Sequence, residues 1–193
     1  MKSVCVFCGS NFGSDTAYAK AAHETGAAIA EAGLTLVYGG AKVGLMGAVA
    51  DGALEAGGRV VGVLPEALQE KELAHEGLSE LHVVSSMHER KAMMADHSDA
   101  FIALPGGAGT LEELFEIWTW GQLGLHQKPC GFLNTNGFYD QLLGFLDHQR
   151  DEGFVKPAMR DMLKVADTPR DLITAFRAYE APTVAKWIRK NET

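Results

Sequence analysis

The stretch FIALPGGAGTLEE, residues 101–113, joins an apolar run to a glycine-rich turn and then to two glutamates. The run from Phe101 to Leu104 is apolar throughout, as in a parallel strand that is buried on both faces. Pro105 ends the run, three glycines follow within four positions, and helical apolar spacing begins near Thr110. The stretch therefore predicts a strand, a tight turn and a helix, which is one unit of a parallel α/β sheet.

The same alternation of apolar runs and helical segments recurs along all 193 residues. The predicted strands are residues 4–8, 34–38, 60–64, 81–84, 101–104 and 130–133. The predicted helices are residues 15–32, 44–56, 87–97, 110–123, 139–152 and 169–179. This pattern predicts the α/β class, with a doubly wound, Rossmann-like parallel sheet flanked by helices. The length predicts a single domain over residues 1–193, with a tail after Glu180 that wraps the surface.

Composition narrows the class of protein. The chain is 47% hydrophobic and 22% charged, which is typical of a globular domain, and its formal net charge is −8. This charge argues against a nucleic acid polymer as partner, whereas a few local donors can still hold a small anion. We expect no membrane span and no secretion, because the sequence has neither a long apolar run nor a signal-peptide layout. With only three cysteines, the chain fits the reducing cytoplasm.

Cys5 and Cys8 form a C-x-x-C pair, a pattern that can indicate a redox site. Redox pairs normally open a helix, whereas these two cysteines lie in a predicted strand. Residues three apart in a strand point to opposite faces of the sheet. We therefore expect two separately packed thiols.

Three glycine-bearing turns follow predicted strands, at the sheet edge where ligands bind in such folds. They contain Gly9 and Ser10, then Gly39, Gly40 and Gly44, and finally Gly106, Gly107 and Gly109. None is a complete dinucleotide fingerprint or a P-loop, which argues against hydride transfer and ATP hydrolysis. One such turn is explained equally well by tight turning of the chain, but three turns at one edge favour a phosphate site. Helix-start N–H groups would bind the anion there, with Thr110 as helix cap and hydroxyl donor.

The helix after the third turn carries two glutamates in different surroundings. Its main apolar stripe consists of Leu111, Leu114, Phe115 and Trp118. Glu113 lies nearly opposite, beside Ile117 and Trp120, so this helix has a second apolar face that we expect another subunit to cover. A carboxylate in apolar surroundings tends to have a raised pKa and can exchange a proton near neutral pH. Glu112 suits the positive end of the helix dipole better.

The helix predicted over residues 87–97 places Arg90 and Lys91 on the same face as Met87 and Met94. Either the stems of these cations pack while their heads reach water, or an anion meets them. Because this helix directly precedes the strand 101–104, it can reach the same crevice as the third turn. The histidine spacings match no metal-binding pattern, so we expect no metal ion.

Four segments carry a resemblance to a known family. They are MHERK (87–91), PGGAGTLEE (105–113), GLMGAVADGAL (44–54) and WTWGQLG (118–124). Together they resemble the LONELY GUY family of cytokinin riboside 5′-monophosphate phosphoribohydrolases, which are often mislabelled lysine decarboxylases. The similarity runs from about residue 2 to about residue 165. The turn GGAKVG departs from the family pattern at Ala41 and Lys42, although Lys42 would add a phosphate contact.

The resemblance implies hydrolysis of the N-glycosidic bond of a nucleoside 5′-monophosphate, which releases the free base and ribose 5-phosphate. By motif match, Arg90 and Glu113 are the implied catalytic pair, and no cofactor is implied. The implied substrate-binding residues are Glu72, Met87, Lys91, Gly106, Gly107, Gly109, Thr110, Glu112 and Thr119, with the glycine turns at Gly9, Ser10, Gly39, Gly40 and Gly44. The family is typically homodimeric, which agrees with a helix that is apolar on two sides.

Glycoside cleavage passes through an oxocarbenium-like state, which a carboxylate stabilises directly or by activating water. We assign this role to Glu113, with Arg90 orienting it through paired donors. A neighbouring cation would lower the pKa of Glu113 while burial would raise it, and the sequence leaves the balance open. Two other functions also remain: a general AMP nucleosidase and a nucleotide-binding module without turnover. An apolar slot for an N6 chain would favour cytokinins, and its candidate residues are Met93, Met94, Trp118 and Trp120.

Overall fold

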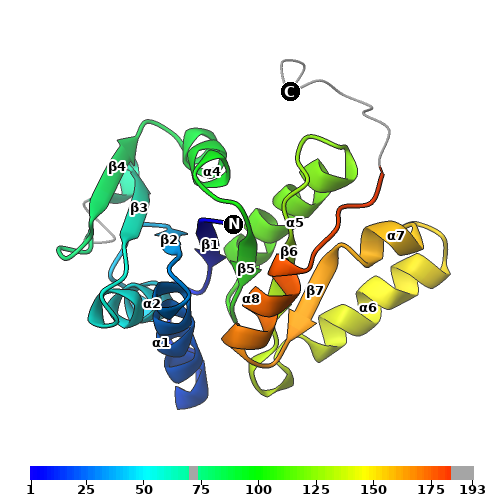
Figure 1. The fold of residues 1–193 in the computed structure, drawn as a ribbon, viewed down its shortest axis with the longest axis horizontal. Coiled ribbons are helices and arrows are strands. Elements are labelled where there is room, and N and C mark those ends of the chain that lie inside the picture. The colour runs from blue at the N-terminus through cyan, green and yellow to red at the C-terminus, as the bar shows by residue number, and fades with distance from the viewer. Residues whose placement is uncertain (70–73, 184–193) are drawn as a thin grey trace.

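The computed structural model describes residues 1–69 and 74–183. Within them, parallel strands form one seven-stranded sheet in the order β4-β3-β2-β1-β5-β6-β7 (Figure 1). The strands are β1 (Ser3–Phe7), β2 (Thr35–Tyr38), β3 (Val60–Pro65), β4 (Glu80–Val84), β5 (Phe101–Ala103), β6 (Cys130–Leu133) and β7 (Leu163–Ala166). The order runs outward in both directions from the β1–β5 pair, which confirms the doubly wound α/β sheet expected from the sequence.

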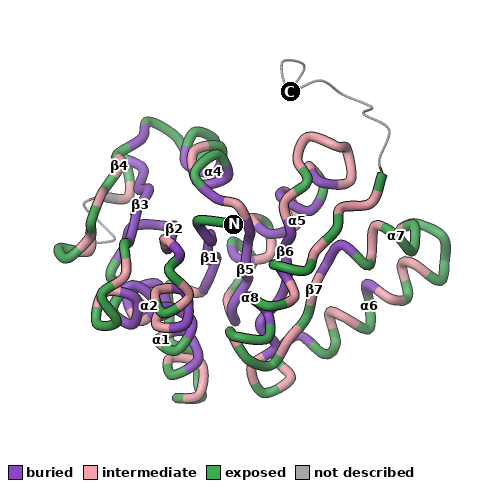
Figure 2. Tube along the Cα trace, in the orientation of Figure 1, coloured by how far each residue is buried: buried purple, intermediate pink, exposed green. Residues whose placement is uncertain are grey.

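Helices cover both faces of this sheet. They are α1 (Thr16–Glu31), α2 (Gly44–Glu55), α3 (Glu66–Gln69), α4 (Met87–Asp96), α5 (Ala108–Gln122), α6 (Asp140–Asp151), α7 (Pro157–Arg160) and α8 (Pro169–Arg177), with the short 3-10 helix η1 (Thr135–Gly137). Side chains of α1, α2 and α8 pack on one face, and those of α4, α5 and α6 pack on the other. The central strands are almost entirely buried between these layers (Figure 2).

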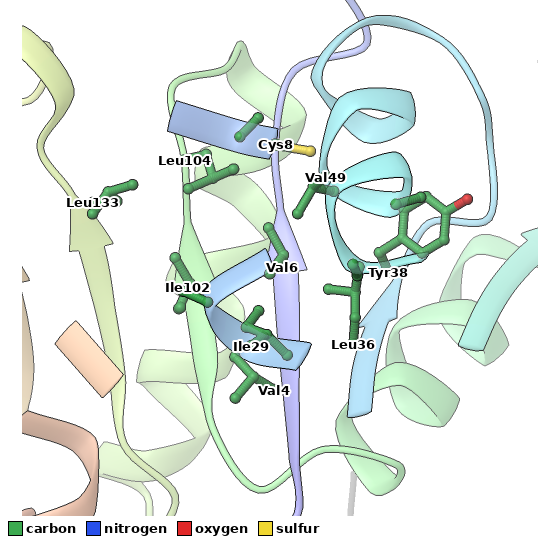
Figure 3. Close-up of a cluster of buried hydrophobic side chains, with 14 of the residues drawn as sticks. Val4, Val6, Cys8, Ile29, Leu36, Tyr38, Val49, Ile102, Leu104 and Leu133 are labelled. Atoms are coloured by element: carbon green, nitrogen blue, oxygen red, sulfur yellow. The ribbon is translucent and has the colours of Figure 1, made fainter. Parts of the chain in front are cut away.

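The core on the α1–α2 face contains residues from both central strands. Val6 of β1, Ile102 of β5 and Ile29 of α1 belong to this cluster (Figure 3). Cys8 belongs to it as well, whereas Cys5 lies in the core on the α4–α5 face, because strand side chains alternate between faces. Burial raises the pKa of both thiols, which keeps them protonated and unreactive. The expectation of two separately packed thiols is confirmed.

The structure also contains elements that the sequence pattern did not predict. Strand β7 was missed because it is a short edge strand in which Leu163 is buried but Val165 is exposed. The short helices α3 and α7 were missed too, and so was η1. Of the tail, the structure describes only the part up to residue 183. None of the helices in residues 1–69 and 74–183 combines the length and the apolar character needed to cross a membrane.

Candidate active site

The three glycine turns meet at one edge of the sheet, because β2, β1 and β5 are neighbours and all end there. The Gly9 N–H donates to Pro105 O at 3.1 Å, which joins the first turn to the third. The Leu45 N–H donates to Gly9 O at 3.0 Å, which joins the first turn to the second. Gly44 has a φ of +54° and lies so close to Ser10 that a side chain there would clash with the Ser10 backbone. The sequence-based expectation that the three turns lie at one edge of the sheet is confirmed.

Helix α5 begins inside the third turn, and its first residues are exposed to solvent. Its N-cap is Gly107, which offers no side-chain acceptor, so the expected capping role of Thr110 is wrong. Thr110 is instead a buried residue of the first helical turn, and its hydroxyl lies against Gly106, where a side chain would clash with it. A Cβ atom at Gly107 or Gly109 would meet no atom within 4 Å. The helix start therefore presents N–H groups that have no partner inside the helix, in open space suited to an anion.

Arg90 of α4 is buried under the turn after β2, with 6% of its surface exposed. Its Nε donates to Val63 O at 3.1 Å and its Nη2 donates to Gly39 O at 3.3 Å. These carbonyls lie at the carboxyl ends of β3 and β2. The alternative in which the Arg90 guanidinium reaches water is therefore wrong, because backbone carbonyls near the sheet edge accept hydrogen bonds from it and hold it in place.

Gly39 is the residue that makes room for this guanidinium. A Cβ atom at position 39 would overlap Arg90 Nη2, and it would also press on Met46 Sδ at 3.1 Å. Glycine is needed here for a close approach of side chain to backbone, and not for a turn conformation. The second glycine turn thus fixes the orientation of the arginine.

Glu113 of α5 faces Arg90 across the gap between α4 and α5. Arg90 Nη1 lies 3.8 Å from Glu113 Oε1, and only 13% of the Glu113 side chain is exposed. The negative charge of Glu113 also contributes to the raised pKa values of Cys5 and Cys8, after burial itself. The carboxylate is therefore close to the end of β1 and next to the glycine turns. The structure brings together the two residues that motif resemblance paired.

Lys91 lies beside this pair and is held between two carboxylates of α5. Its Nζ donates to Glu112 Oε1 at 2.6 Å and lies 2.9 Å from Glu116 Oε2. Burial lowers the pKa of Lys91, but the two carboxylates outweigh it, so the net pKa is raised and the side chain stays charged. Glu112 therefore pairs with a cation, besides lying near the helix start. Glu116 was missed, although Glu112 and Glu116 share a helix face by their spacing of four.

The other candidate residues occupy different places. Met87 is 45% exposed at the start of α4, with its sulfur 3.9 Å from Arg90 Nη1. Thr119 lies about two helical turns after Glu112 in α5. Its hydroxyl donates to Phe115 O of the same helix at 2.7 Å. Glu72 lies outside the described residues. Gly40 has a φ of +79°, and its carbonyl accepts from His75 N at 3.0 Å, which anchors the segment that follows Glu72.

The second apolar face expected for α5 is only partly present. Ile117 packs in the core of its own chain, with 2% exposed, whereas Trp120 is half-buried. Trp120 lines a cavity of about 660 Å³ between α4 and α5, together with Lys91, Glu116, Leu125 and Lys128. A smaller pocket of about 210 Å³ lies beyond the carboxyl ends of β1 and β5, on the α1 side. Its lining includes Gly9, Ser10, Phe12, Tyr18, Gly106 and Phe138.

Several known proteins resemble this chain. Residues 46–176 match the family model described as possible lysine decarboxylase. The chain is similar to a cytokinin riboside 5′-monophosphate phosphoribohydrolase of Rhodococcoides fascians, at 54% identity over 92% of this chain and 90% of the relative. It is also similar to an enzyme of the same name from Arabidopsis thaliana, at 49% identity over 93% and 78%.

Among solved structures, the chain is similar to the molybdenum cofactor carrier protein of Chlamydomonas reinhardtii. The TM-score is 0.70 at 24% identity, over 92% of this chain and 96% of the other. At this identity the likeness shows the fold alone.

Proposed function

Because this chain belongs to the LONELY GUY family of cytokinin riboside 5′-monophosphate phosphoribohydrolases, we propose that it hydrolyses the N-glycosidic bond of N6-modified adenosine 5′-monophosphates. The products are the free base and ribose 5-phosphate. The observation that carries this proposal is the buried Arg90–Glu113 pair, at 3.8 Å, beside an open helix start at the glycine turns. One end of the nucleotide would meet N–H groups there, and the reacting sugar would meet the carboxylate.

In this proposal the substrate phosphate binds at the start of α5. The N–H groups near Gly107 and Gly109 bind the phosphate oxygens, and the helix dipole adds a favourable field. Thr110 lies buried in the same first turn, with its hydroxyl against Gly106. The turns at Gly9, Ser10, Gly39, Gly40 and Gly44 close the crevice around it. Phosphate binding fixes the ribose relative to the carboxylate, and this positioning accounts for part of the rate.

Glu113 acts on the sugar as the glycosidic bond breaks. Positive charge develops on C1′ and the ring oxygen, and the carboxylate stabilises it or accepts a proton from the attacking water. The water oxygen bonds to C1′, and the base departs with the electron pair of the glycosidic bond and gains a proton. Arg90 holds Glu113 in position, while the Val63 and Gly39 carbonyls hold Arg90. Met87, Lys91, Glu112, Thr119 and Glu72 complete the proposed substrate-binding set.

Decarboxylation of lysine does not fit this site. A pyridoxal phosphate enzyme needs a lysine amine that can lose its proton to form the Schiff base. Lys91 is the lysine next to the Arg90–Glu113 pair, and two carboxylates raise its pKa. A charged, doubly paired ammonium is a poor nucleophile.

The test is chromatography of the free base released from three compounds. They are N6-isopentenyl adenosine 5′-monophosphate, AMP and the corresponding N6-modified nucleoside without phosphate. We expect release of base and ribose 5-phosphate from the first compound, faster than from AMP. The nucleoside should react at least about 100-fold more slowly, because it lacks the phosphate that positions the sugar. A higher rate with AMP would favour the general AMP nucleosidase, and no release from a folded protein would favour a binding module.

We also propose that the protein is a homodimer, with the α4–α5 cavity covered by a second copy. The cavity of about 660 Å³ exposes part of Trp120 and Leu125 beside the catalytic helices, which supports an apolar contact there. Light scattering should give about twice the mass of the 20.7 kDa chain. Trp120→Glu should shift the protein towards the monomer, and a monomeric wild type would contradict the proposal.

Two further proposals concern the whole chain. We propose that residues 1–193 form one nucleotide-binding hydrolase domain, which limited proteolysis would test by yielding one resistant core.

We propose a cytoplasmic location, supported by three cysteines that are all free and buried. Cell fractionation that finds the protein outside the cytoplasm would contradict this location.

A further inference from the structure

Two sets of ion pairs join α4 to α5 side by side. Successive residues of α4, Arg90 and Lys91, face successive residues of α5, Glu113 and Glu112. Lys91 also reaches Glu116, one helical turn further along α5. The ion pairs of Lys91, which hold the two helices together, are therefore next to the Arg90–Glu113 pair, which is proposed to carry out the reaction.

The two carboxylates that hold Lys91 differ in burial. The Glu112 side chain is 57% exposed, so water competes for its bond to Lys91 and weakens it. The Glu116 side chain is 28% exposed, and its Oε2 atom, which faces Lys91, is completely buried. The Lys91 side chain itself is 10% exposed. The Lys91–Glu116 contact is thus the less solvated of the two, and charge attraction is stronger where water is excluded.

The Lys91–Glu116 contact limits where α4 can sit. Arg90 precedes Lys91 in the same helix, so a shift of Lys91 away from α5 carries the Arg90 backbone with it. Arg90 Nη1 and Glu113 Oε1 are already 3.8 Å apart, close to the limit of a direct ion pair. A small outward shift of α4 would separate them.

We propose that Glu116 is a positioning residue for the Arg90–Glu113 pair: it holds Lys91, and through it α4, at the distance from α5 that the reaction requires. This inference rests on the proposed function. Glu116 acts through Lys91, because its Oε2 atom faces Lys91 and is buried, so that atom is not open to the substrate. Its effect therefore belongs to the chemical step more than to substrate binding.

The test is Glu116→Gln, which keeps the size of the side chain and removes its charge. We expect kcat for base release to fall about tenfold, since misplacement of catalytic groups by about 1 Å costs up to about 10²-fold. KM should change less than kcat, since the phosphate site at the start of α5 is unchanged. Glu116→Asp keeps the charge and should recover part of kcat. The matched control is Glu31→Gln, which removes an exposed ion pair between α1 and α8 and should leave kcat unchanged.

A second measurement separates positioning from general destabilisation. In a Glu113→Gln background, Glu116→Gln should lower the residual rate by less than about twofold, because residues that act as one unit are not additive. A full tenfold further loss would overturn the proposal, and so would a Glu116→Gln protein with altered KM and unchanged kcat. If the wild-type protein releases no base, the proposed function itself fails. Loss of activity in Glu116→Gln alone, with an active wild type, concerns Glu116 and leaves the proposed function standing.

Discussion

Replacing Glu113 with glutamine is expected to lower kcat for base release by about 10³-fold, within the range for loss of a catalytic acid or base. The change keeps the shape of a side chain that is only 13% exposed, but it removes the charge that stabilises the cationic sugar. Rates of base release measured by chromatography at saturating substrate would give the residual kcat.

The control for this variant is its substrate affinity. If Glu113 acts only in the reaction, Glu113→Gln should bind the nucleotide about as tightly as the wild type, since the phosphate contacts remain. Calorimetric titration measures that affinity. Wild-type turnover in Glu113→Gln would remove Glu113 from the mechanism.

Gly39→Ala is the second change with a large expected effect. The new methyl group would overlap Arg90 Nη2, so the guanidinium must leave its place on the Gly39 and Val63 carbonyls. We expect kcat to fall by about 10²-fold through the misplaced arginine. We also expect the free energy of unfolding to fall by about 1–3 kcal/mol, as for other overpacked buried sites. Kinetics and chemical denaturation measure the two effects.

Gly144→Ala provides the matched control. Gly144 lies in α6, a Cβ atom there would meet no atom within 4 Å, and its φ is not positive. This substitution should raise stability by up to about 1 kcal/mol through helix propensity and leave kcat unchanged. If Gly39→Ala behaves like Gly144→Ala, the tight fit between Arg90 and the second turn is not needed for the reaction.

The sequence predicted the strands that are buried on both faces, because short continuous apolar runs such as residues 101–104 are typical of such strands. It missed β7, where only part of a short edge strand is buried and the apolar signal is weak. It also placed the start of α5 at Thr110 instead of Ala108, because glycines hide a helix start that has no side-chain cap. Helix limits in glycine-rich turns depend on backbone geometry that residue types do not specify.

For the site, too, the sequence predicted what local motifs indicate and missed contacts between residues far apart in the chain. Motif resemblance paired Arg90 with Glu113, and the structure brings them together. Nothing local shows that Arg90 would be buried on the Gly39 carbonyl, 51 positions away, because that contact depends on the packing of α4 over β2 and β3. Glu116 was accessible in principle from its spacing to Glu112, but its partner Lys91 is 25 positions earlier in the sequence. The substrate contacts assigned to the glycine turns stay predictions.

The most direct test of the account is a crystal structure of Glu113→Gln with bound N6-isopentenyl adenosine 5′-monophosphate. The account predicts the phosphate within hydrogen-bond distance of the N–H groups at the start of α5, near Gly107 and Gly109. It predicts C1′ in contact with the residue 113 side chain, and Arg90 still on the Val63 and Gly39 carbonyls. A nucleotide whose phosphate lies away from α5, or whose C1′ does not touch residue 113, would contradict the central claim.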